Sequence, residues 1–251
     1  MNMPLIITDA EGNLLYASRG VTVSGALRLW LGTAAKCYKD PVVYMDSNPI
    51  VVRSVLLAGK KYYFFVEKQK LVNCFGIDES RIGDKFFDSF DGKWGNRVFV
   101  SLKMLVNTFS RAYSEDLFDA GVRVSQRLLA KDVFVNVSPT AFVLCLALMT
   151  RLCAESGCEV RLSCVNDDGR AVVYADCVRG TPIKTPEREL LRLLLYEVAA
   201  SAGFKIEGRL AAGKWSYKIE TSPVDIGLYG FKADSLERFE NVFKAYISMF
   251  L

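Results

Sequence analysis

One uninterrupted apolar run, Ala141 to Met149, constrains the fold of this chain more than any other feature. It follows Ser138 and Pro139, which are typical of a helix N-cap and of the first helical position. The pattern predicts a helix that continues to about Glu155 and ends before Gly157. The run is too short to cross a bilayer. We therefore expect a buried helix in a globular protein, and no membrane span.

The composition is sufficient for a large hydrophobic core and argues against a nucleic-acid partner. Apolar residues make up 51% of the 251 residues, and the formal net charge is only +4. Lys and Arg form no long run, so we expect no nucleic-acid partner. The first twelve residues lack a basic segment followed by an apolar one, so we expect no signal peptide.

The cysteine and histidine content limits the kinds of catalysis and metal binding that this chain can perform. The seven cysteines form an odd set without a Cys-x-x-Cys pair, which is typical of reduced core cysteines in a cytoplasmic protein. No residue is a histidine. The chain therefore has no phosphoacceptor histidine, histidine base or histidine metal ligand, and we identify no catalytic residue and no metal site.

The first 73 residues predict a small antiparallel sheet. The expected elements are strands at 5–8, 14–17, 49–57 and 61–67 and a helix at 25–35. Ala58-Gly59-Lys60 is expected to be a hairpin turn.

A helical hairpin is predicted next, over about residues 96–130. Apolar residues recur at helical spacing from Val98 to Phe109, and Ser114 is a candidate cap for a second helix. Two such hairpins packed as a four-helix bundle would form a homodimer through 96–130. A lone hairpin must instead be covered by the flanking domains.

The rest of the chain alternates strand and helix. The expected elements are strands at 132–137, 159–165, 170–176, 204–208 and 215–220 and helices at 139–155 and from Thr185-Pro186 to Ala202-Gly203. Asn166 to Gly169 is expected to be a hairpin turn. An amphipathic helix from about Ala233 ends the chain, and its aromatic stripe is expected to pack on the protein itself.

The order of these elements resembles a sensor histidine kinase. The segment Ile6 to Tyr16 resembles the opening strands of a PAS sensor domain, and Val51 to Glu67 resembles its last strands. The hairpin stands where such a kinase has its dimerisation and phosphoacceptor helices. Residues 131–222 resemble, in element order, the ATP-binding catalytic domain of these kinases.

The fold class that this resemblance implies is α+β. It comprises a PAS-like antiparallel sheet domain at 1–75 and a linker with a dimerisation hairpin at 76–130. An α/β two-layer sandwich resembling the kinase ATPase domain follows at 131–223, and the C-terminal amphipathic helix occupies 224–251.

The sequence departs from this family at the positions that bind magnesium and ATP in the family. The family's long ATPase helix carries asparagines that hold magnesium and phosphates. The corresponding stretch, Leu144 to Glu155, has none, and Thr150 and Arg151 lie near the second expected position. Only Thr181 to Thr185 separate the next helix from the preceding strand, which leaves no room for an ATP lid.

Asp176 and Gly180 are the candidate cofactor-binding residues. The family's adenine-binding box reads Asp-x-Gly-x-Gly, and here Asp176 and Gly180 match it while Val178 replaces the middle glycine. A β-branched residue crowds the backbone there. The alternative is that Asp176 is an ordinary aspartate at a strand end or turn.

One other glycine pattern has two interpretations. Gly208, Gly213 and Lys214 have the spacing of a phosphate loop, but Trp215 replaces its Ser or Thr, and the pattern lies between two strands. We interpret it as a turn.

Three functional hypotheses remain open. The first is a non-catalytic signalling protein on a degenerate sensor-kinase plan that binds a response-regulator receiver or a true kinase. The second is an adenine-nucleotide-binding protein that holds ATP through Asp176. The third is an enzyme on an unrelated α+β fold, with a deep pocket of converging carboxylates or a lysine.

Overall fold

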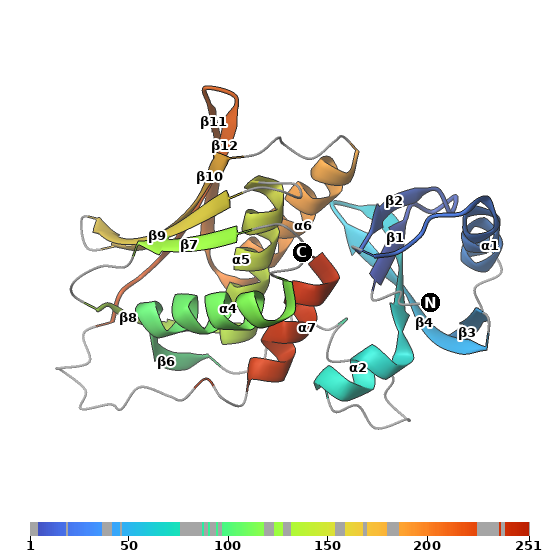
Figure 1. Ribbon diagram of the computed structural model, residues 1–251, viewed down its shortest axis with the longest axis horizontal. Coiled ribbons are helices and arrows are strands. Elements are labelled where there is room, and N and C mark those ends of the chain that lie inside the picture. Colours follow the sequence, from blue (N-terminus) through green and yellow to red (C-terminus); the bar gives the residue numbers. More distant parts are fainter. Residues whose placement is uncertain are drawn as a thin grey trace.

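A computed structural model of the chain shows two packed halves (Figure 1). The residues it describes are 5–18, 20–36, 42–45, 47–75, 87, 90, 94, 97–117, 123–127, 132–153, 159–167, 170–179, 186–224, 236 and 239–250.

The N-terminal half is an antiparallel sheet flanked by helices. Its elements are β1 (Leu5–Thr8), β2 (Leu14–Ala17), α1 (Gly25–Lys36), β3 (Val42–Met45), β4 (Asn48–Leu57), β5 (Lys60–Glu67) and α2 (Lys68–Phe75). The strand order is β2-β1-β5-β4-β3. The predicted strands, the helix and the turn between β4 and β5 are confirmed. Ala58 and Gly59 both have positive φ, 48° and 75°, as a tight two-residue hairpin requires.

This sheet is buried on both faces, which explains its nearly continuous apolar strands. Ile6, Val52 and Phe65 pack with helix α1 on one face. Their neighbours Ile7 and Phe64 point to the other face and join a core that extends through the C-terminal half. Alternate residues of one strand therefore lie in different clusters, and neither face is free to be polar.

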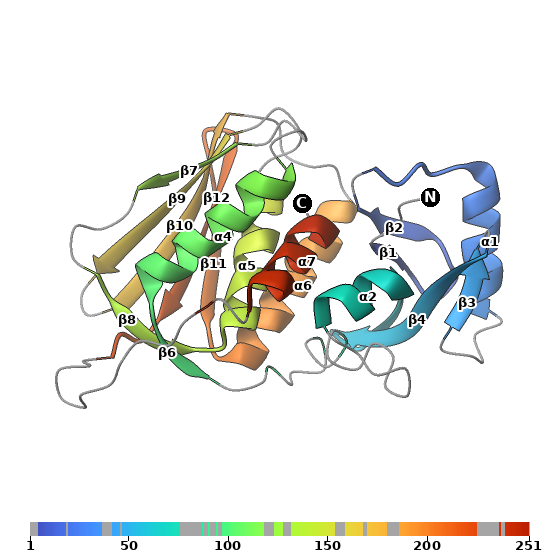
Figure 2. The same ribbon diagram turned by 60° about the horizontal axis from the view of Figure 1, so that its bottom comes forward.

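The C-terminal half is a five-stranded sheet with helices on one face (Figures 1 and 2). Its elements are β6 (Val98–Ser101), α4 (Leu102–Leu117), β7 (Arg123–Arg127), β8 (Phe134–Val137), α5 (Pro139–Cys153), β9 (Glu159–Asp167), β10 (Arg170–Arg179), α6 (Glu187–Ala202), β11 (Lys205–Ala211), β12 (Lys214–Thr221) and α7 (Glu240–Phe250). The order is β11-β12-β10-β9-β7, and β6 pairs with β8 separately.

The predicted helical hairpin at 96–130 is wrong. Helix α4 is present, but Val98–Ser101 is a strand that pairs with β8, and Arg123–Arg127 is a strand parallel to β9. Ser101 sets the start of α4, because its hydroxyl accepts a hydrogen bond from the Met104 N–H at 2.9 Å. Pairing with the free edge of β9 outweighs the weak local preference of residues 123–127.

Helix α4 is covered within its own chain, so the structure removes the reason for the predicted four-helix-bundle dimer. Its apolar residues Leu105, Val106 and Phe109 are fully buried. Helix α7 packs against α4, as well as against α5 and α2. The oligomeric state itself stays a prediction.

Helix α7 joins the two halves. It lies between α5 and the N-terminal half (Figure 2). Its aromatic stripe packs on the chain itself, as predicted, with Phe243, Tyr246 and Phe250 fully buried. The carbonyl oxygen of Met249 accepts hydrogen bonds from the Tyr16 hydroxyl at 2.6 Å and the Ser18 hydroxyl at 2.7 Å.

Helix α6 ends as predicted but begins differently. Gly203 ends it with a left-handed φ of 77°, and the Arg97 guanidinium donates to the Ala202 carbonyl at 2.9 Å. At its start Pro186 occupies the N-cap position and supplies no side-chain cap, and Thr185 lies outside the described residues. Its first turn holds Glu187 and Glu189, where the helix dipole favours acids.

Candidate functional site

Asp176 lies inside strand β10 and points away from the helices. It is half-buried, while its neighbours Ala175 and Cys177 are buried on the helix-covered face. Its carboxylate accepts a hydrogen bond from the Ser216 hydroxyl, directly opposite on β12. The structure thus places Asp176 in a cross-strand polar pair on the open face of the sheet. It is neither at a strand end nor in a turn.

The rest of the predicted adenine site is only partly described. Gly180 lies outside the described residues. Val178 is described, and its carbonyl oxygen accepts a hydrogen bond from the Lys214 ammonium at 2.5 Å. The role of Asp176 and Gly180 toward a nucleotide therefore stays a prediction.

Helix α5 occupies the place where the resemblance put the magnesium and phosphate ligands, and it is covered on all sides. Thirteen of its fifteen residues are buried. The sheet strands β10 and β12 and the helices α4, α6 and α7 all contact it. Thr150 is fully buried, and its hydroxyl has no hydrogen-bond partner among the described residues.

Arg151 ties α5 to α6 at this place. Its guanidinium lies 2.7 Å from the Glu187 carboxylate in the first turn of α6. The exposed fractions of the two side chains are 12% and 27%, so the pair is largely shielded from water. The sequence pointed to Arg151 only as a replacement for an asparagine, and its partner could not be found without the tertiary fold.

A stack of three side chains beside this pair was not predicted. The Arg188 guanidinium lies 3.7 Å from the centre of the Trp215 ring, and that ring stacks on Tyr217. Burial raises the pKa of the Tyr217 hydroxyl to about 12, and the nearby Arg188 partly counteracts this. Arg188 and Trp215 are far apart in sequence, so no local sequence pattern could predict their cation–π contact.

The segment from Gly208 to Lys214, which has the spacing of a phosphate loop, contains a hairpin turn between β11 and β12, as we interpreted it. A Cβ at Gly208 would lie 2.6 Å from the Tyr217 ring, so this glycine makes room for an aromatic side chain. Gly213 and Ala212 have φ of 74° and 51° and form the tight turn between β11 and β12.

The four cysteines whose side chains are described are core residues, as predicted. Cys145, Cys153, Cys164 and Cys177 are all buried. Burial raises the pKa of the Cys145 and Cys153 thiols far above the ordinary value, which keeps them protonated. Among the described residues no group of three or more cysteine or acidic side chains is arranged to hold a metal ion. Asp168 and Gly169, in the predicted turn, lie outside the described residues.

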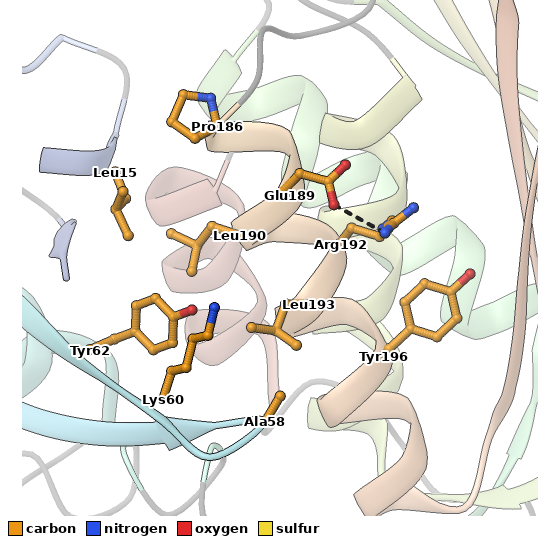
Figure 3. A pocket seen from close by; sticks show the side chains of 10 residues that line it. All are labelled: Leu15, Ala58, Lys60, Tyr62, Pro186, Glu189, Leu190, Arg192, Leu193 and Tyr196. Atoms are coloured by element: carbon orange, nitrogen blue, oxygen red, sulfur yellow. Dashed lines mark ion pairs between the residues drawn. The ribbon is translucent and has the colours of Figure 1, made fainter. Parts of the chain in front are cut away.

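A cavity in the described part of the chain lies elsewhere, between the two halves. It is a groove of about 730 Å³ between the β4–β5 hairpin and helix α6 (Figure 3). Leu15, Lys60 and Tyr62 line it from the N-terminal half, and Leu190 and Leu193 face them from α6. Neither Asp176 nor Arg151 lines it.

Comparison by sequence identifies no relative. The chain matches no protein-family model, and no curated protein is significantly similar to it. None of the described helices has the length and hydrophobicity needed to cross a membrane.

Comparison by structure finds histidine kinases. The Acinetobacter baumannii histidine kinase AdeS is 14% identical with a TM-score of 0.44, over 58% of this chain and 79% of that one. The nucleotide-free catalytic domain of histidine kinase ThkA is 13% identical with a TM-score of 0.42, over 51% and 96%. A Burkholderia phymatum histidine kinase is 13% identical with a TM-score of 0.41, over 57% and 80%. The chain is therefore structurally similar, at low identity, to histidine kinase cytoplasmic and catalytic domains.

Proposed function

We propose that this protein is a non-catalytic signalling or regulatory protein on a degenerate sensor-kinase plan, and that it acts by binding other proteins in the cytoplasm. The observation that carries the proposal is the burial of α5. A helix covered by a sheet and by three other helices has no open side on which to hold a magnesium triphosphate. The Arg151–Glu187 pair, which joins α5 to the first turn of α6, supports the same conclusion.

The antiparallel sheet of the N-terminal half supports a PAS-like origin for that half. We propose that it serves as a regulatory half rather than as a separate sensor, because one hydrophobic core runs through both halves. A homodimer remains part of the proposal, but α4 would not supply an apolar interface, since its described apolar residues other than the partly buried Met104 are already buried.

The open face of the C-terminal sheet is the surface that we propose for a protein partner. Arg123, Arg127, Arg161 and Arg209 lie on this face, are exposed, and make no ion pair with a described residue. Two acids lie opposite two of these arginines, Glu159 opposite Arg123 and Asp176 opposite Arg161, and each accepts a hydrogen bond from a serine and makes no ion pair with the arginine. By charge complementarity the partner has an acidic surface, and a response-regulator receiver or a kinase is the class we propose.

Nucleotide binding tests the proposal directly. Thermal unfolding of the purified chain is measured with ATP and ADP, each with and without magnesium, and we expect no shift in Tm. A ligand that bound the folded state at 100 times its Kd would add about 2.7 kcal/mol of stability, which such an experiment detects easily.

The variant Asp176→Ala separates the alternatives. A rise in Tm with nucleotide that Asp176→Ala abolishes would establish the adenine-binding hypothesis and refute ours. A rise that persists in Asp176→Ala would also refute ours and would place the nucleotide elsewhere. Labelled ATP should transfer no phosphate to the chain, and transfer would contradict the non-catalytic proposal outright.

A further inference from the structure

We propose that the groove between the β4–β5 hairpin and α6 binds a small amphipathic anion, namely a carboxylate or sulfonate with an aromatic or aliphatic body. This site is independent of the proposed function, because it needs neither a nucleotide nor a protein partner. Its size suits such a ligand, since small-molecule sites enclose about 300–1,000 Å³ and this groove encloses about 730 Å³.

The walls of the groove are mostly apolar and come from both halves of the molecule. Leu190 and Leu193 project from α6 toward the N-terminal sheet, and Leu15 and Tyr62 face them from the other side (Figure 3). Ala58, from the hairpin turn, also lines the groove. These side chains offer an aromatic or aliphatic ligand body a surface on two opposite sides.

Lys60 provides the charge. Its side chain stands beside Tyr62 and reaches toward α6 (Figure 3). No described carboxylate lies within ion-pair distance of its ammonium. The other charges of the groove, Glu189 and Arg192, neutralise each other across 3.0 Å. Of the charged side chains that line the groove, Lys60 is therefore the one without an ion pair to a described residue.

The acids of the adjoining hollow make no ion pair with Lys60. A smaller hollow adjoins the groove and shares Leu15, Lys60 and Tyr62 with it, and Asp9 and Glu11 line this hollow. The Asp9 carboxylate accepts hydrogen bonds from the Asn13 N–H at 2.7 Å and the Asn13 side-chain amide at 2.8 Å. It also accepts one from the Glu11 N–H at 3.0 Å, so these bonds hold the carboxylate in the turn and away from an ion pair with Lys60.

The balance of charge and apolar surface selects the ligand class. One ammonium has three donors and matches a single carboxylate or sulfonate, whereas a di- or triphosphate needs several cations or backbone donors together. A free inorganic anion would leave the half-buried side chains of Leu15 and Leu193 uncovered. A cationic ligand would be repelled by the Lys60 ammonium. An anionic head on an apolar body satisfies both parts of the groove.

The first experiment uses anilinonaphthalene sulfonate, an aromatic sulfonate whose fluorescence rises in apolar surroundings. Titration of the full chain, followed by fluorescence and by calorimetry, should show saturable binding with one site per chain. Binding with many sites per chain, or no saturable binding below the millimolar range, would overturn the proposal.

Variants locate the site. Lys60→Met keeps the apolar stem and removes the charge, so it should weaken binding by about tenfold or more. Leu193→Asp, at a half-buried position, sets a carboxylate opposite Lys60 and should weaken binding at least as much. Lys103→Met is the matched control at an exposed lysine on α4, and it should leave the affinity within about twofold.

A charge-reversed pair of competitors tests the ligand class. Octanoate should displace the probe, and octylammonium at the same concentration should not. Equal displacement by both, or equal probe affinity in the wild type, Lys60→Met and Leu193→Asp, would overturn the proposal. Thermal unfolding of each variant shows whether it is folded, and the nucleotide experiment is unaffected by any of these outcomes.

Discussion

At the scale of single residues, the Arg151–Glu187 pair and the Tyr217 hydroxyl are the most informative groups. Arg151 and Glu187 join α5 to α6, and Tyr217 lies on β12, which also contacts α5. Each is a polar group in a shielded place, so its contribution depends on what it contacts rather than on its own polarity.

The Arg151–Glu187 pair should contribute more to stability than an exposed pair on the same helix. Glu187→Gln leaves a guanidinium that is only 12% exposed without its carboxylate, and should lower the free energy of unfolding by about 1–3 kcal/mol. Glu189→Gln is the control, since the exposed fractions of Glu189 and its partner Arg192 are 53% and 47%. It should cost less than about 1 kcal/mol.

Urea unfolding of the two variants measures this difference. Both glutamates lie in the first turn of α6, so the loss of the favourable dipole interaction is similar in each and largely cancels. Equal costs for the two variants would contradict the assignment of Arg151–Glu187 as a shielded pair.

Tyr217 should make stability fall in alkaline solution. The unfolded tyrosine loses its proton near its ordinary pKa of about 10, whereas burial raises the pKa in the folded protein to about 12. Between these values the unfolded state binds fewer protons, so rising pH favours unfolding. We expect this group to account for about 1–2 kcal/mol of lost stability over that interval.

Tyr217→Phe isolates the effect. The Tyr217 hydroxyl has no hydrogen-bond partner among the described residues, so the variant should match the wild type within about 1 kcal/mol at neutral pH. Chemical unfolding from pH 8 to 11 under reducing conditions should show the wild type losing more stability than the variant. Parallel pH profiles would contradict the raised pKa.

At the scale of elements, α7 determines how the two halves meet. It packs on α2, α4 and α5, and its last turn is anchored by Tyr16 and Ser18 from the N-terminal half. The Tyr16 ring also packs near the Phe250 ring, with centroids 5.8 Å apart.

The two hydroxyls that share the Met249 carbonyl should be coupled. Tyr16→Phe and Ser18→Ala should each lower the free energy of unfolding by about 0.5–1.5 kcal/mol, because the remaining hydroxyl still satisfies the carbonyl. The double variant leaves a buried carbonyl unpaired and should cost more than the two single changes added together. Tyr44→Phe, at a residue 68% exposed, is the control. An additive double-mutant cycle would contradict the shared acceptor.

At the scale of the whole molecule, one hydrophobic core extends from the N-terminal sheet through α5, α6 and α7. Sequence patterns divided the chain at about residue 75, yet Leu5, Phe64 and Val66 lie in the same cluster as Phe142 and Phe250. A boundary in the element pattern is therefore not a boundary in the packing.

The chain should unfold as one cooperative unit. Trp30 reports on the N-terminal half, and Trp94 and Trp215 report on the C-terminal half. Denaturant transitions followed by tryptophan fluorescence, in the wild type and in Trp30→Phe, should coincide with the transition followed by far-ultraviolet circular dichroism. Separate transitions would show that the halves fold independently.

Sequence patterns alone determined most of the elements of this fold. The strands at 5–8, 49–57 and 61–67, the buried helix from Pro139 and the hairpins at 58–60 and 208–215 all have strong local causes. Those causes are apolar period, capping residues, and turns that need positive φ. The absence of histidine likewise excluded a whole class of chemistry without any structure.

Only the tertiary structure decided what depends on pairing and burial. Residues 123–127 form a strand because they pair with the edge of β9. Helix α5 is covered because α7 packs on it in addition to the sheet and the helices α4 and α6. Arg151 forms an ion pair with Glu187, and Lys60 lines a groove with residues of α6, because elements distant in sequence pack together. Local patterns report the conformation of a segment, but contacts between distant segments are set by how apolar faces are buried, and the sites of this protein consist of such contacts.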